Sequence, residues 1–326
     1  MKSILTLTLN PCVDISSRVE EVLPEEKLRC DKSQYDPGGG GINVSRVVKK
    51  LGGRSVALYC GGGPIGDLLE ELLDRESLER KSVKIKAWSR QSFTVFERKS
   101  NQQFRFSMPG PTLMKSEWQE CLDYIFNLVP APFYVVLSGS LPPGVPTAFI
   151  TQLARQLKEA ESRLVVDTSG EALLQAAREN VYLLKPNLRE FSSLLNREQI
   201  DDDELESCCV EFVEKGFCEN LILSLGERGA ILATSNGVKR ITAPSVIPKS
   251  KIGAGDSMVG GIVFGLANDY SLSESAVLGV AAGTAAVLTE GTELCDEDDV
   301  WKIYREIRQK KKEQRDERRL QRTNEN

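Results

Sequence analysis

The stretch "RLVVDTSGEALLQAARENVYLLKPN", residues 163–187, decides the fold class of this 326-residue chain. It begins with the apolar run 163–168, passes through a segment of helical character at 171–179, and ends in a second apolar run at 181–187. Continuous apolar strands separated by an amphipathic helix are typical of a parallel sheet that is covered on both faces. The stretch therefore predicts one strand–helix–strand unit of an α/β fold.

The same pattern extends over nearly the whole chain. Further strands are expected at 3–9, 55–60, 133–139 and 220–226. Helices are expected near 42–52, 66–75, 115–128, 146–160, 188–196 and 202–216, and two helices rich in small residues follow near the C-terminal end. The first of these two contains Gly260, Gly261 and Gly265, which weaken a helix and indicate that another element approaches it closely.

Two segments, 14–36 and 86–107, interrupt the pattern with short alternating strands and a hairpin turn at 100–101. Such alternation predicts a half-exposed antiparallel sheet. Because no Pro- or Ser-rich linker sets these segments apart, we expect one domain at 1–305. It would be a three-layer αβα sandwich with a mainly parallel sheet and a small projecting β-sheet lid, followed by a charged tail at 306–326 that is a helix end or disordered.

The absence of histidine excludes several classes of enzyme. Ser-His-Asp and Cys-His hydrolases and His-ligated zinc enzymes cannot be built from this chain. The eight cysteines are scattered without a C-x-x-C pair, which favours reduced thiols over a zinc site. Any proton transfer must therefore use Asp, Glu, Lys, Tyr or Cys.

Charge and hydropathy limit the partners. A net charge of −5 argues against a general nucleic-acid binder. The N-terminus alternates like a strand rather than a signal peptide, and no apolar run approaches the ~18 residues that span a membrane. We therefore expect a cytoplasmic protein without nucleic-acid or membrane partners. For the basic segment 305–326, a solvated helix end is favoured over an arm for an anionic partner.

Two glycine-rich loops precede helices. In "PGGGGINVSR" (37–46), four glycines and Asn43 suit a ligand that approaches the backbone, although a flexible turn is the alternative. In "CGGGPIGDLLEELL" (60–73), Gly61, Gly63 and Gly66 match the dinucleotide pattern G-x-G-x-x-G. Pro64 removes one amide that would face a pyrophosphate, so a nicotinamide-dependent oxidoreductase is kept only as a minor alternative.

Two further motifs place oxygen atoms and amides near a helix start. In "KPNLRE" (185–190), Asn187 and Glu190 share one helix face and suit Mg²⁺, although a capping box explains the spacing equally well. In "GAGD" (253–256), the first-turn amides and the helix dipole form an anion site beside Asp256. The alternative for Asp256 is a simple helix cap.

The tetraglycine loop, "KPNLRE" and "GAGD" occur in this order along the chain, and together they resemble the signatures of the ribokinase-like carbohydrate kinases. The stretches "TLTLNPCVD", "SGSLPPGV" and "DTSGEAL" are similar to the bacterial ATP-dependent 6-phosphofructokinases of that family. The resemblance implies ATP-dependent phosphorylation of fructose 6-phosphate at its 1-hydroxyl. Tagatose 6-phosphate and fructose 1-phosphate are the alternative substrates, and a non-catalytic sugar-phosphate sensor is the alternative function.

The resemblance also implies roles for individual residues. Asp256 would be the catalytic base, beside an anion hole formed by Gly253, Ala254 and Gly255. Lys185 would contact the ATP phosphates, and Asn187 and Glu190 would hold Mg²⁺ through water. The nucleotide would be bordered by a set of small residues, which are Ser224, Gly226, Gly229, Gly279 and Gly283.

The sugar phosphate would lie under the lid. The implied sugar-binding residues are Asp14, Gly39, Gly40, Asn43 and Ser140. Arg90, Arg105, Lys27 and Arg29 would bind its phosphate, since guanidinium groups suit phosphate, with surface solvation as the alternative for each.

A cation and a second copy complete the implied partners. A K⁺ ion would lie near Ser250, Ile252, Ala286, Thr289, Gly291 and Glu293. Glu293 either assists that ion or is simply exposed. Pairing of lids would protect their strand edges, so a homodimer is expected.

Overall fold

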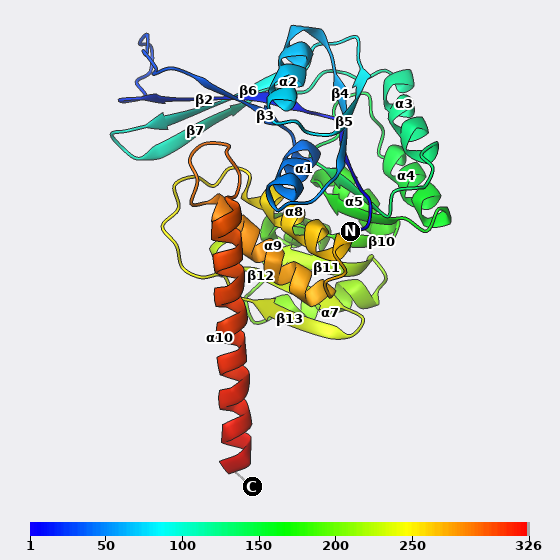
Figure 1. Cartoon of the computed structure of the whole chain (residues 1–326), viewed down its shortest axis with the longest axis vertical. Helices are drawn as coiled ribbons and strands as arrows, with labels where there is room; N and C mark the ends of the chain where they lie inside the picture. The colour runs from blue at the N-terminus through cyan, green and yellow to red at the C-terminus, as the bar shows by residue number, and fades with distance from the viewer. Residues whose placement is uncertain (325–326) are drawn as a thin grey trace.

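A nine-stranded sheet forms the middle layer of the structure, a computed structural model that describes residues 1–324 (Figure 1). Its strands are β1 (Ile4–Thr8), β4 (Val56–Gly61), β5 (Arg80–Lys84), β8 (Tyr134–Ser138), β9 (Arg163–Asp167), β10 (Val181–Leu184), β11 (Cys218–Ser224), β12 (Ala230–Thr234) and β13 (Gly237–Ile241). They lie in the order β13-β12-β11-β10-β9-β8-β1-β4-β5. All neighbours from β11 to β5 are parallel, whereas β12 and β13 are antiparallel additions.

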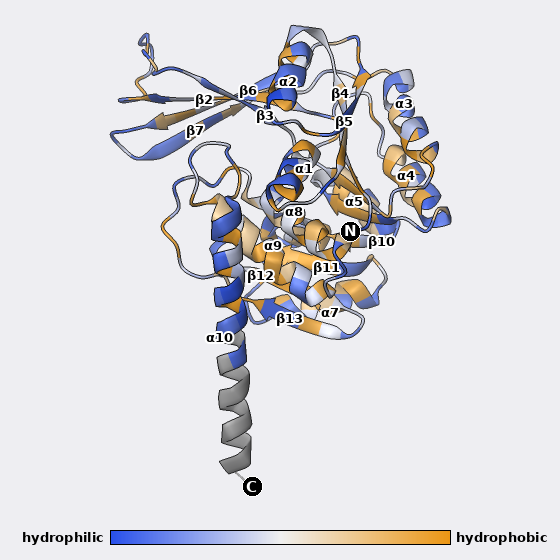
Figure 2. Ribbon diagram, viewed as in Figure 1, coloured by the Kyte–Doolittle hydropathy of each residue, from blue (hydrophilic) through white to orange (hydrophobic). Residues whose placement is uncertain are grey.

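Alternate residues of the central strands enter two separate cores. In β8, Val135 and Leu137 pack on one face of the sheet, whereas Tyr134 and Val136 pack on the other. The first face is covered by α3 (Lys115–Phe126), α4 (Ala148–Glu159), α5 (Gly170–Arg178), α6 (Leu188–Leu194) and α7 (Leu205–Glu214). The second is covered by α1 (Gly40–Lys50), α8 (Ala254–Ala267), α9 (Leu272–Ala286) and α10 (Glu297–Asn324). The hydropathy colouring shows the apolar sheet enclosed between helices whose outer faces are polar (Figure 2).

The predicted α/β fold is confirmed. The unit at 163–187 forms β9, α5 and β10, and β10 pairs in parallel with β9 through Leu183 and Val165. The other expected strands and helices also have counterparts. β5, β12 and β13 were not predicted. β5 is a largely exposed edge strand of sequence RKSVK, with Val83 as its one buried residue.

A four-stranded lid projects from the body at the left of Figure 1. It contains β2 (Cys12–Val19), β3 (Gln34–Gly38), β6 (Arg90–Glu97) and β7 (Gln102–Ser107), in the order β3-β2-β6-β7. The expectation of a purely antiparallel lid was wrong, because β2 and β6 are parallel. Each of these two strands leads its segment away from the body, so they run in the same direction, and each is then followed by an antiparallel partner.

Glycines of α8 permit the close approach that their presence predicted. A Cβ on Gly260 would lie 2.5 Å from Val47 of α1, and one on Gly261 would lie 2.8 Å from the Leu278 carbonyl oxygen of α9. Both distances are below any real Cβ contact. Helix α8 is therefore held tightly against α1 and α9, and its N-terminus is fixed relative to the sheet.

Helix α10 extends well beyond the body of the molecule (Figure 1). It contains most of the segment that was expected as a charged tail, whose residues 325 and 326 lie outside the described part of the chain. Within residues 1–324, no helix is both long and apolar enough to cross a membrane.

Candidate active site

The N-terminus of α8 carries Asp256 in its first turn. Gly253 caps the helix with φ 74°, a left-handed backbone conformation that residues other than glycine rarely adopt. The first intrahelical hydrogen bond runs from the Ser257 amide to the Gly253 carbonyl at 2.8 Å. The amides of Ala254, Gly255 and Asp256 precede it and therefore have no acceptor within the helix. Together with the helix dipole they form a site for an anion.

Asp256 lies among groups from four different elements. Asn43 at the start of α1 donates its side-chain amide to Asp256 Oδ2 at 2.8 Å. Burial of the carboxyl group and the nearby charge of Asp167 raise its pKa to about 7, while Asn43 and Lys185 oppose that shift. The residue is nevertheless only half-buried, so a substrate can reach it. A carboxyl group with a pKa near neutrality is suited to proton transfer.

Lys185 and Asp167 form a buried ion pair beside this helix end. Asp167 is the last residue of β9, and Lys185 directly follows the neighbouring strand β10. Lys185 Nζ lies 3.0 Å from Asp167 Oδ1. Burial is the largest influence and lowers the pKa of the Lys185 ammonium group, but Asp167, with smaller help from Glu190 and Asp256, brings the net shift upward. A Cβ on Gly255 would lie 3.7 Å from Lys185 Nζ. The ammonium group therefore faces the first turn of α8, where it adds positive charge to the anion site.

Asn187 and Glu190 form the capping box that was the alternative reading of their motif, and their Mg²⁺ role stays a prediction. Asn187 Oδ1 accepts from the Glu190 amide, and Glu190 Oε2 accepts from the Asn187 amide, each at 2.9 Å, so the two form a capping box for α6. Ser224 lies beside them, because its amide donates to the Pro186 carbonyl at 2.9 Å. The capping box uses one oxygen of Glu190, and a carboxylate has a second that can face a hydrated ion.

No cluster of three or more acidic or thiol ligands for a metal occurs among the described residues. Mg²⁺ commonly keeps several waters and uses one or two carboxylates together with phosphates. A single carboxylate at Glu190, whose charge acts on nearby Lys185, fits that mode of binding.

Asp14 on β2 lies under the lid. Burial raises the pKa of its carboxyl group, whereas Cys12, Arg105 and Arg90 oppose the shift. Cys12 Sγ donates to Asp14 Oδ1 at 3.2 Å. A Cβ on Gly38 would lie 2.2 Å from Asp14 Oδ2, so glycine at that position makes room for the carboxylate.

The tetraglycine loop is fitted against neighbouring strand ends. A Cβ on Gly40 would lie 2.3 Å from Ser138 Oγ, and Gly39 has φ 118°. The loop positions Asn43, whose backbone amide bonds to the Gly39 carbonyl at 2.9 Å. Two predicted sugar-binding glycines therefore lie between Asp14 and Asp256 in the fold, next to strand β8.

Asn10 joins two predicted residues that are distant in sequence. Its Nδ2 donates to Ser140 Oγ at 2.9 Å, and its Oδ1 accepts from Arg90 Nε at 3.0 Å. Neither Asn10 nor Asp167 was predicted from the sequence. Asp167 ends β9 and Asn10 lies two residues after β1, and that position at the carboxyl edge of a parallel sheet is the signal that would have found them.

Lys27 and Arg29 are not brought to this cluster within one chain. They lie exposed in the loop between β2 and β3, at the far end of the lid. Arg105 of β7 is also exposed, but its charge acts on Asp14. Of the four predicted phosphate-binding cations, the structure places Arg90 and Arg105 near Asp14.

The loop predicted to hold K⁺ is closely hydrogen-bonded. Ser250 Oγ donates to the Gly291 carbonyl at 3.0 Å and accepts from the Ile252 amide at 3.2 Å. Thr289 Oγ1 bonds to the carbonyl of Ala286 at 2.8 Å. The Ser250 amide donates to the carbonyl of Val287, next to Ala286, at 3.4 Å and so links the two groups. The Glu293 side chain instead lines cavities outside the loop.

The small residues predicted around the nucleotide divide into two groups. Gly226 and Gly229 belong to the turn after β11, next to Ser224. Gly279 and Gly283 allow close packing of α9 on α8, since a Cβ on Gly279 would lie 2.4 Å from Ile262. This packing explains both glycines of α9 structurally, and their contact with an adenine stays a prediction.

The dinucleotide-like glycines at 61–66 are covered by the chain itself. A Cβ on Gly62 would lie 2.3 Å from the carbonyl oxygens of Ile85 and Ala87, and one on Gly63 would lie 2.4 Å from Trp88. The loop before β6 thus lies where a pyrophosphate would have to approach the start of α2 (Gly63–Arg75). This geometry argues against the oxidoreductase alternative.

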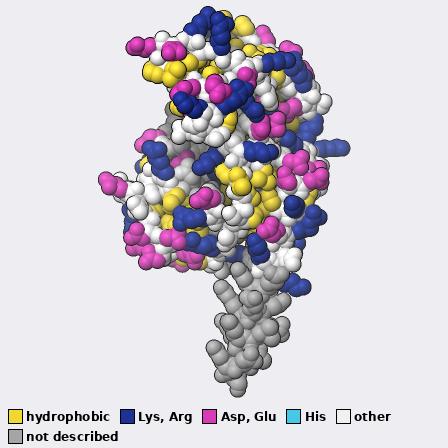
Figure 3. Space-filling model, turned by 90° about the vertical axis from the view of Figure 1, so that its left-hand side faces the viewer, with side chains coloured by type: hydrophobic (Ala, Val, Ile, Leu, Met, Phe, Trp, Pro, Cys, Tyr) yellow, Lys and Arg dark blue, Asp and Glu magenta, His cyan; other side chains and the backbone are white. Residues whose placement is uncertain are grey.

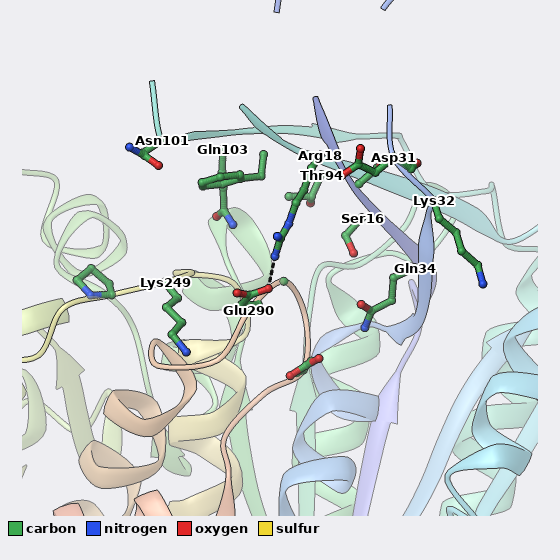
Figure 4. Close-up of a pocket in the computed structure, with 15 residues that line it drawn as sticks. Ser16, Arg18, Asp31, Lys32, Gln34, Thr94, Asn101, Gln103, Lys249 and Glu290 are labelled. Atoms are coloured by element: carbon green, nitrogen blue, oxygen red, sulfur yellow. Dashed lines mark hydrogen bonds and ion pairs between the residues drawn. The ribbon is translucent and has the colours of Figure 1, made fainter. Parts of the chain in front are cut away.

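A cavity of about 640 Å³ lies between the polar underside of the lid and the loops that precede α8 and follow α9 (Figure 4). Ser16, Thr94 and Gln103 point into it from the lid, and Lys249 and Glu290 lie opposite. Figure 3 shows a recess between the lid and the body on this side of the molecule. Because Asp14 lies two residues before Ser16 on the same face of β2, the cavity continues outward from the site.

Comparison with known proteins identifies this arrangement. Residues 7–299 match the model of the pfkB family carbohydrate kinases. The chain is 41% identical over 305 residues to the ATP-dependent 6-phosphofructokinase isozyme 2 of Escherichia coli K12, covering 93% of this chain and 98% of that protein. It is 33% identical over 309 residues to the 1-phosphofructokinase of Borreliella burgdorferi, covering 94% and 97%.

A solved structure agrees with the sequence comparison. The crystal structure of phosphofructokinase-2 from Escherichia coli in complex with fructose-6-phosphate has a TM-score of 0.89 and 40% identity to this chain. The alignment covers 94% of this chain and 99% of that one. The likeness spans the sheet, the lid and the helix that carries Asp256. The chain therefore belongs to the pfkB family of carbohydrate kinases.

Proposed function

We propose that this kinase transfers the γ-phosphoryl group of ATP to the 1-hydroxyl of fructose 6-phosphate. The observation that carries the proposal is the position of Asp256, a half-buried carboxyl group with a pKa near 7 beside three free amides and the Lys185 ammonium group. A base next to an anion site is what phosphoryl transfer to an alcohol requires.

Each residue has a defined part in that reaction. The sugar oxygen attacks the γ-phosphorus, the bond from phosphorus to the ADP oxygen breaks, and Asp256 takes the hydroxyl proton. The amides of Ala254, Gly255 and Asp256 stabilise the charge on the transferred group. Lys185 contacts the phosphates, while Asp14 accepts hydrogen bonds from sugar hydroxyls. Because catalysis rests on position and charge, no histidine is needed.

Mg²⁺ is assigned to Glu190 and Asn187 through water. When bound, the ion neutralises phosphate charge. On the nucleotide side, Ser224, Gly226 and Gly229 form the turn that borders the phosphates. K⁺ is assigned to the hydrogen-bonded loop around Ser250 and Gly291, since a related Escherichia coli structure is described in complex with potassium. Equal turnover in potassium and in tetramethylammonium chloride at one ionic strength would remove that ion from the proposal.

Fructose 6-phosphate is favoured over fructose 1-phosphate by the comparison, because the 6-phosphofructokinase relative is more similar than the 1-phosphofructokinase. Arg90 and Arg105 near Asp14 supply the phosphate contacts. The test is a panel of fructose 6-phosphate, tagatose 6-phosphate and fructose 1-phosphate with MgATP and coupled detection of ADP. We expect the highest kcat/KM for fructose 6-phosphate, and fast turnover of either other sugar alone would overturn the choice.

A homodimer through the lid completes the proposal. Tyr35 and Phe106 are 46% and 50% exposed on the face of the lid opposite Asp14, and Phe93 lies between them in register. Hydrophobic side chains are visible over the lid in the upper part of Figure 3. An exposed apolar sheet face with open edges is suited to pairing with a second copy.

A further inference from the structure

A chain of hydrogen bonds leads from the end of α2 to the proposed base. It runs from Glu76 to Arg46, from Arg46 to Asn43, and from Asn43 to Asp256. We infer that Arg46 is a positioning residue that fixes the orientation of the Asn43 amide toward Asp256. The inference rests on the proposed function, because it gives Arg46 a part in the reaction through the assigned base.

Arg46 is held rigidly on the inner side of α1. Arg46 is only 4% exposed, and such burial is rare for arginine unless its hydrogen-bond donors are satisfied. Nε donates to Glu76 Oε2 at 2.8 Å, and Nη2 lies 2.7 Å from Glu76 Oε1. Nη1 donates to the Pro37 carbonyl at 3.0 Å and to Asn43 Oδ1 at 3.2 Å. The planar guanidinium group thus meets three partners at fixed angles.

This contact decides which end of the Asn43 amide faces Asp256. A guanidinium group has donors and no acceptor, so only the oxygen of the amide can face Arg46. The nitrogen must then face Asp256, where it donates to Oδ2 at 2.8 Å. Without Arg46, the Asn43 amide can rotate and present its oxygen to the Asp256 carboxylate. The hydrogen bond would then be lost, and the two oxygens would repel each other.

The orientation matters because Asn43 is one of two groups that favour the charged form of Asp256. Lys185 is the other, while Asp167 and Asp14 disfavour that form from strands β9 and β2. A hydrogen bond donated to the carboxylate keeps it deprotonated and aims one oxygen. The other oxygen remains for the substrate hydroxyl.

Arg46 also joins this system to the lid. The Pro37 carbonyl belongs to β3, directly before Gly38, whose lack of a side chain makes room for Asp14. One guanidinium group therefore holds the end of a lid strand and the amide beside the base at the same time. Loss of Arg46 is expected to affect kcat more than the binding of ATP, since Lys185 and the turn after β11 do not depend on it.

The experiment is a double-mutant cycle on the full chain, with MgATP and fructose 6-phosphate as substrates. Asn43→Ala and Arg46→Met are each expected to lower kcat/KM roughly tenfold to hundredfold, the range for a hydrogen bond to a charged group. If Arg46 acts through Asn43, the double variant loses no more than Asn43→Ala alone, within about twofold. Losses that multiply would overturn the inference.

A second readout is the acid limb of the kcat/KM profile against pH. Arg46→Met is expected to move this limb to higher pH, and Arg46→Lys, which keeps one donor, to restore part of the shift. An unmoved limb would overturn the inference. If Arg46→Met is recovered unfolded, Arg46→Lys takes its place in the cycle.

The matched control is Arg80→Met. Arg80 also clamps α2 through a partly buried ion pair, with Glu70 at 3.0 Å and Asp74 at 2.7 Å, but it has no path to Asp256. It is expected to lower the melting temperature and leave kcat/KM and its pH profile unchanged.

Asp256→Asn separates the two proposals. If this variant turns over nearly as fast as the unmodified protein, Asp256 is not the base and the proposed function fails. If it is inactive but the losses at positions 43 and 46 multiply, only the positioning role of Arg46 fails.

Discussion

Lys185 Nζ lies 3.0 Å from Asp167 Oδ1, and both groups act on the carboxyl group of Asp256, the proposed base. Lys185 is predicted to contact phosphate, and Asp167 raises the pKa of Asp256. The two strand ends therefore hold both the ammonium group that is proposed to contact the phosphates and the carboxylate that raises the pKa of the proposed base. Both effects arise from charged groups, Lys185 and Asp167, at the carboxyl edge of the parallel sheet.

Removal of Asp167 would leave a buried ammonium group without its partner. The Lys185 side chain is 6% exposed and that of Asp167 is 15% exposed, so Asp167→Ala is expected to lower the free energy of unfolding by about 3 kcal/mol. Urea denaturation would measure the loss. Asp202→Ala is the matched control, because Asp202 pairs with Arg228 and Arg240 at the surface and should cost less than about 1 kcal/mol. Equal losses in the two variants would contradict the importance of burial.

Asp256→Asn is expected to lower kcat by orders of magnitude and to leave ATP binding nearly unchanged, since it removes the base but no phosphate contact. It should also stabilise the fold at pH 8. The pKa of Asp256 is about 7 in the folded protein and near 4 when unfolded, so deprotonation costs stability progressively as the pH rises from 4 to 7. The difference between these two values corresponds to about 4 kcal/mol at pH 8. Because Asp256 is only half-buried and solvent screens its charge, we expect the asparagine variant to escape about half of this cost, ~2 kcal/mol. Asp269→Asn on the surface is the control, and a less stable Asp256→Asn would refute the argument.

The same pKa predicts the pH dependence of the reaction. Only the deprotonated carboxylate can accept the hydroxyl proton, so kcat/KM should fall about tenfold per pH unit below pH 7 and level off above it. A coupled assay with the fructose 6-phosphate concentration held well below KM gives the profile. A flat profile between pH 5.5 and 8 would show that no group with this pKa controls the step.

The sequence sufficed for most of the fold because the signals are local. The buried strands are short continuous apolar runs, and the helices between them have a regular polar face, so period and length alone locate them. The edge strand β5 escaped detection because it buries only Val83. The parallel pairing of β2 with β6 also escaped, since nothing in either strand records the direction of a partner about eighty residues away in the chain.

The site was predictable where its residues share a motif and not where they meet through the fold. Asn187 and Glu190 are three residues apart, and Asp256 follows its own glycines. Asn10 and Asp167 act on residues from other strands, and a single polar residue after a strand is common. The glycines at 61–66 show the opposite failure, because a correct local pattern is filled by the loop that carries Trp88.

Arg105→Gln is expected to raise KM for fructose 6-phosphate roughly tenfold to hundredfold with a smaller effect on kcat, because a guanidinium contact to phosphate is lost in the bound and the transition state alike. Steady-state kinetics at saturating MgATP would measure it. Arg98→Gln is the matched control on the same lid, since Arg98 is engaged by Asp31 and faces no sugar. An unchanged KM in Arg105→Gln would place the phosphate elsewhere.

The apolar outer face of the lid predicts the oligomeric state. Phe106 is 50% exposed and lies opposite Phe93 in the register of β6 and β7, and Tyr35 lies in the same row at the other edge of the lid, beyond Ile15 of β2. If two lids pair through this face, Phe106→Asp places a charge in the interface and should convert the dimer to a monomer at micromolar concentration. Sedimentation velocity would report the change directly. Ile247→Asp is the matched control, because Ile247 is 89% exposed on a loop of the body and should leave the dimer intact. A dimer that survives Phe106→Asp, or a monomeric unmodified protein, would show that the exposed face serves another purpose.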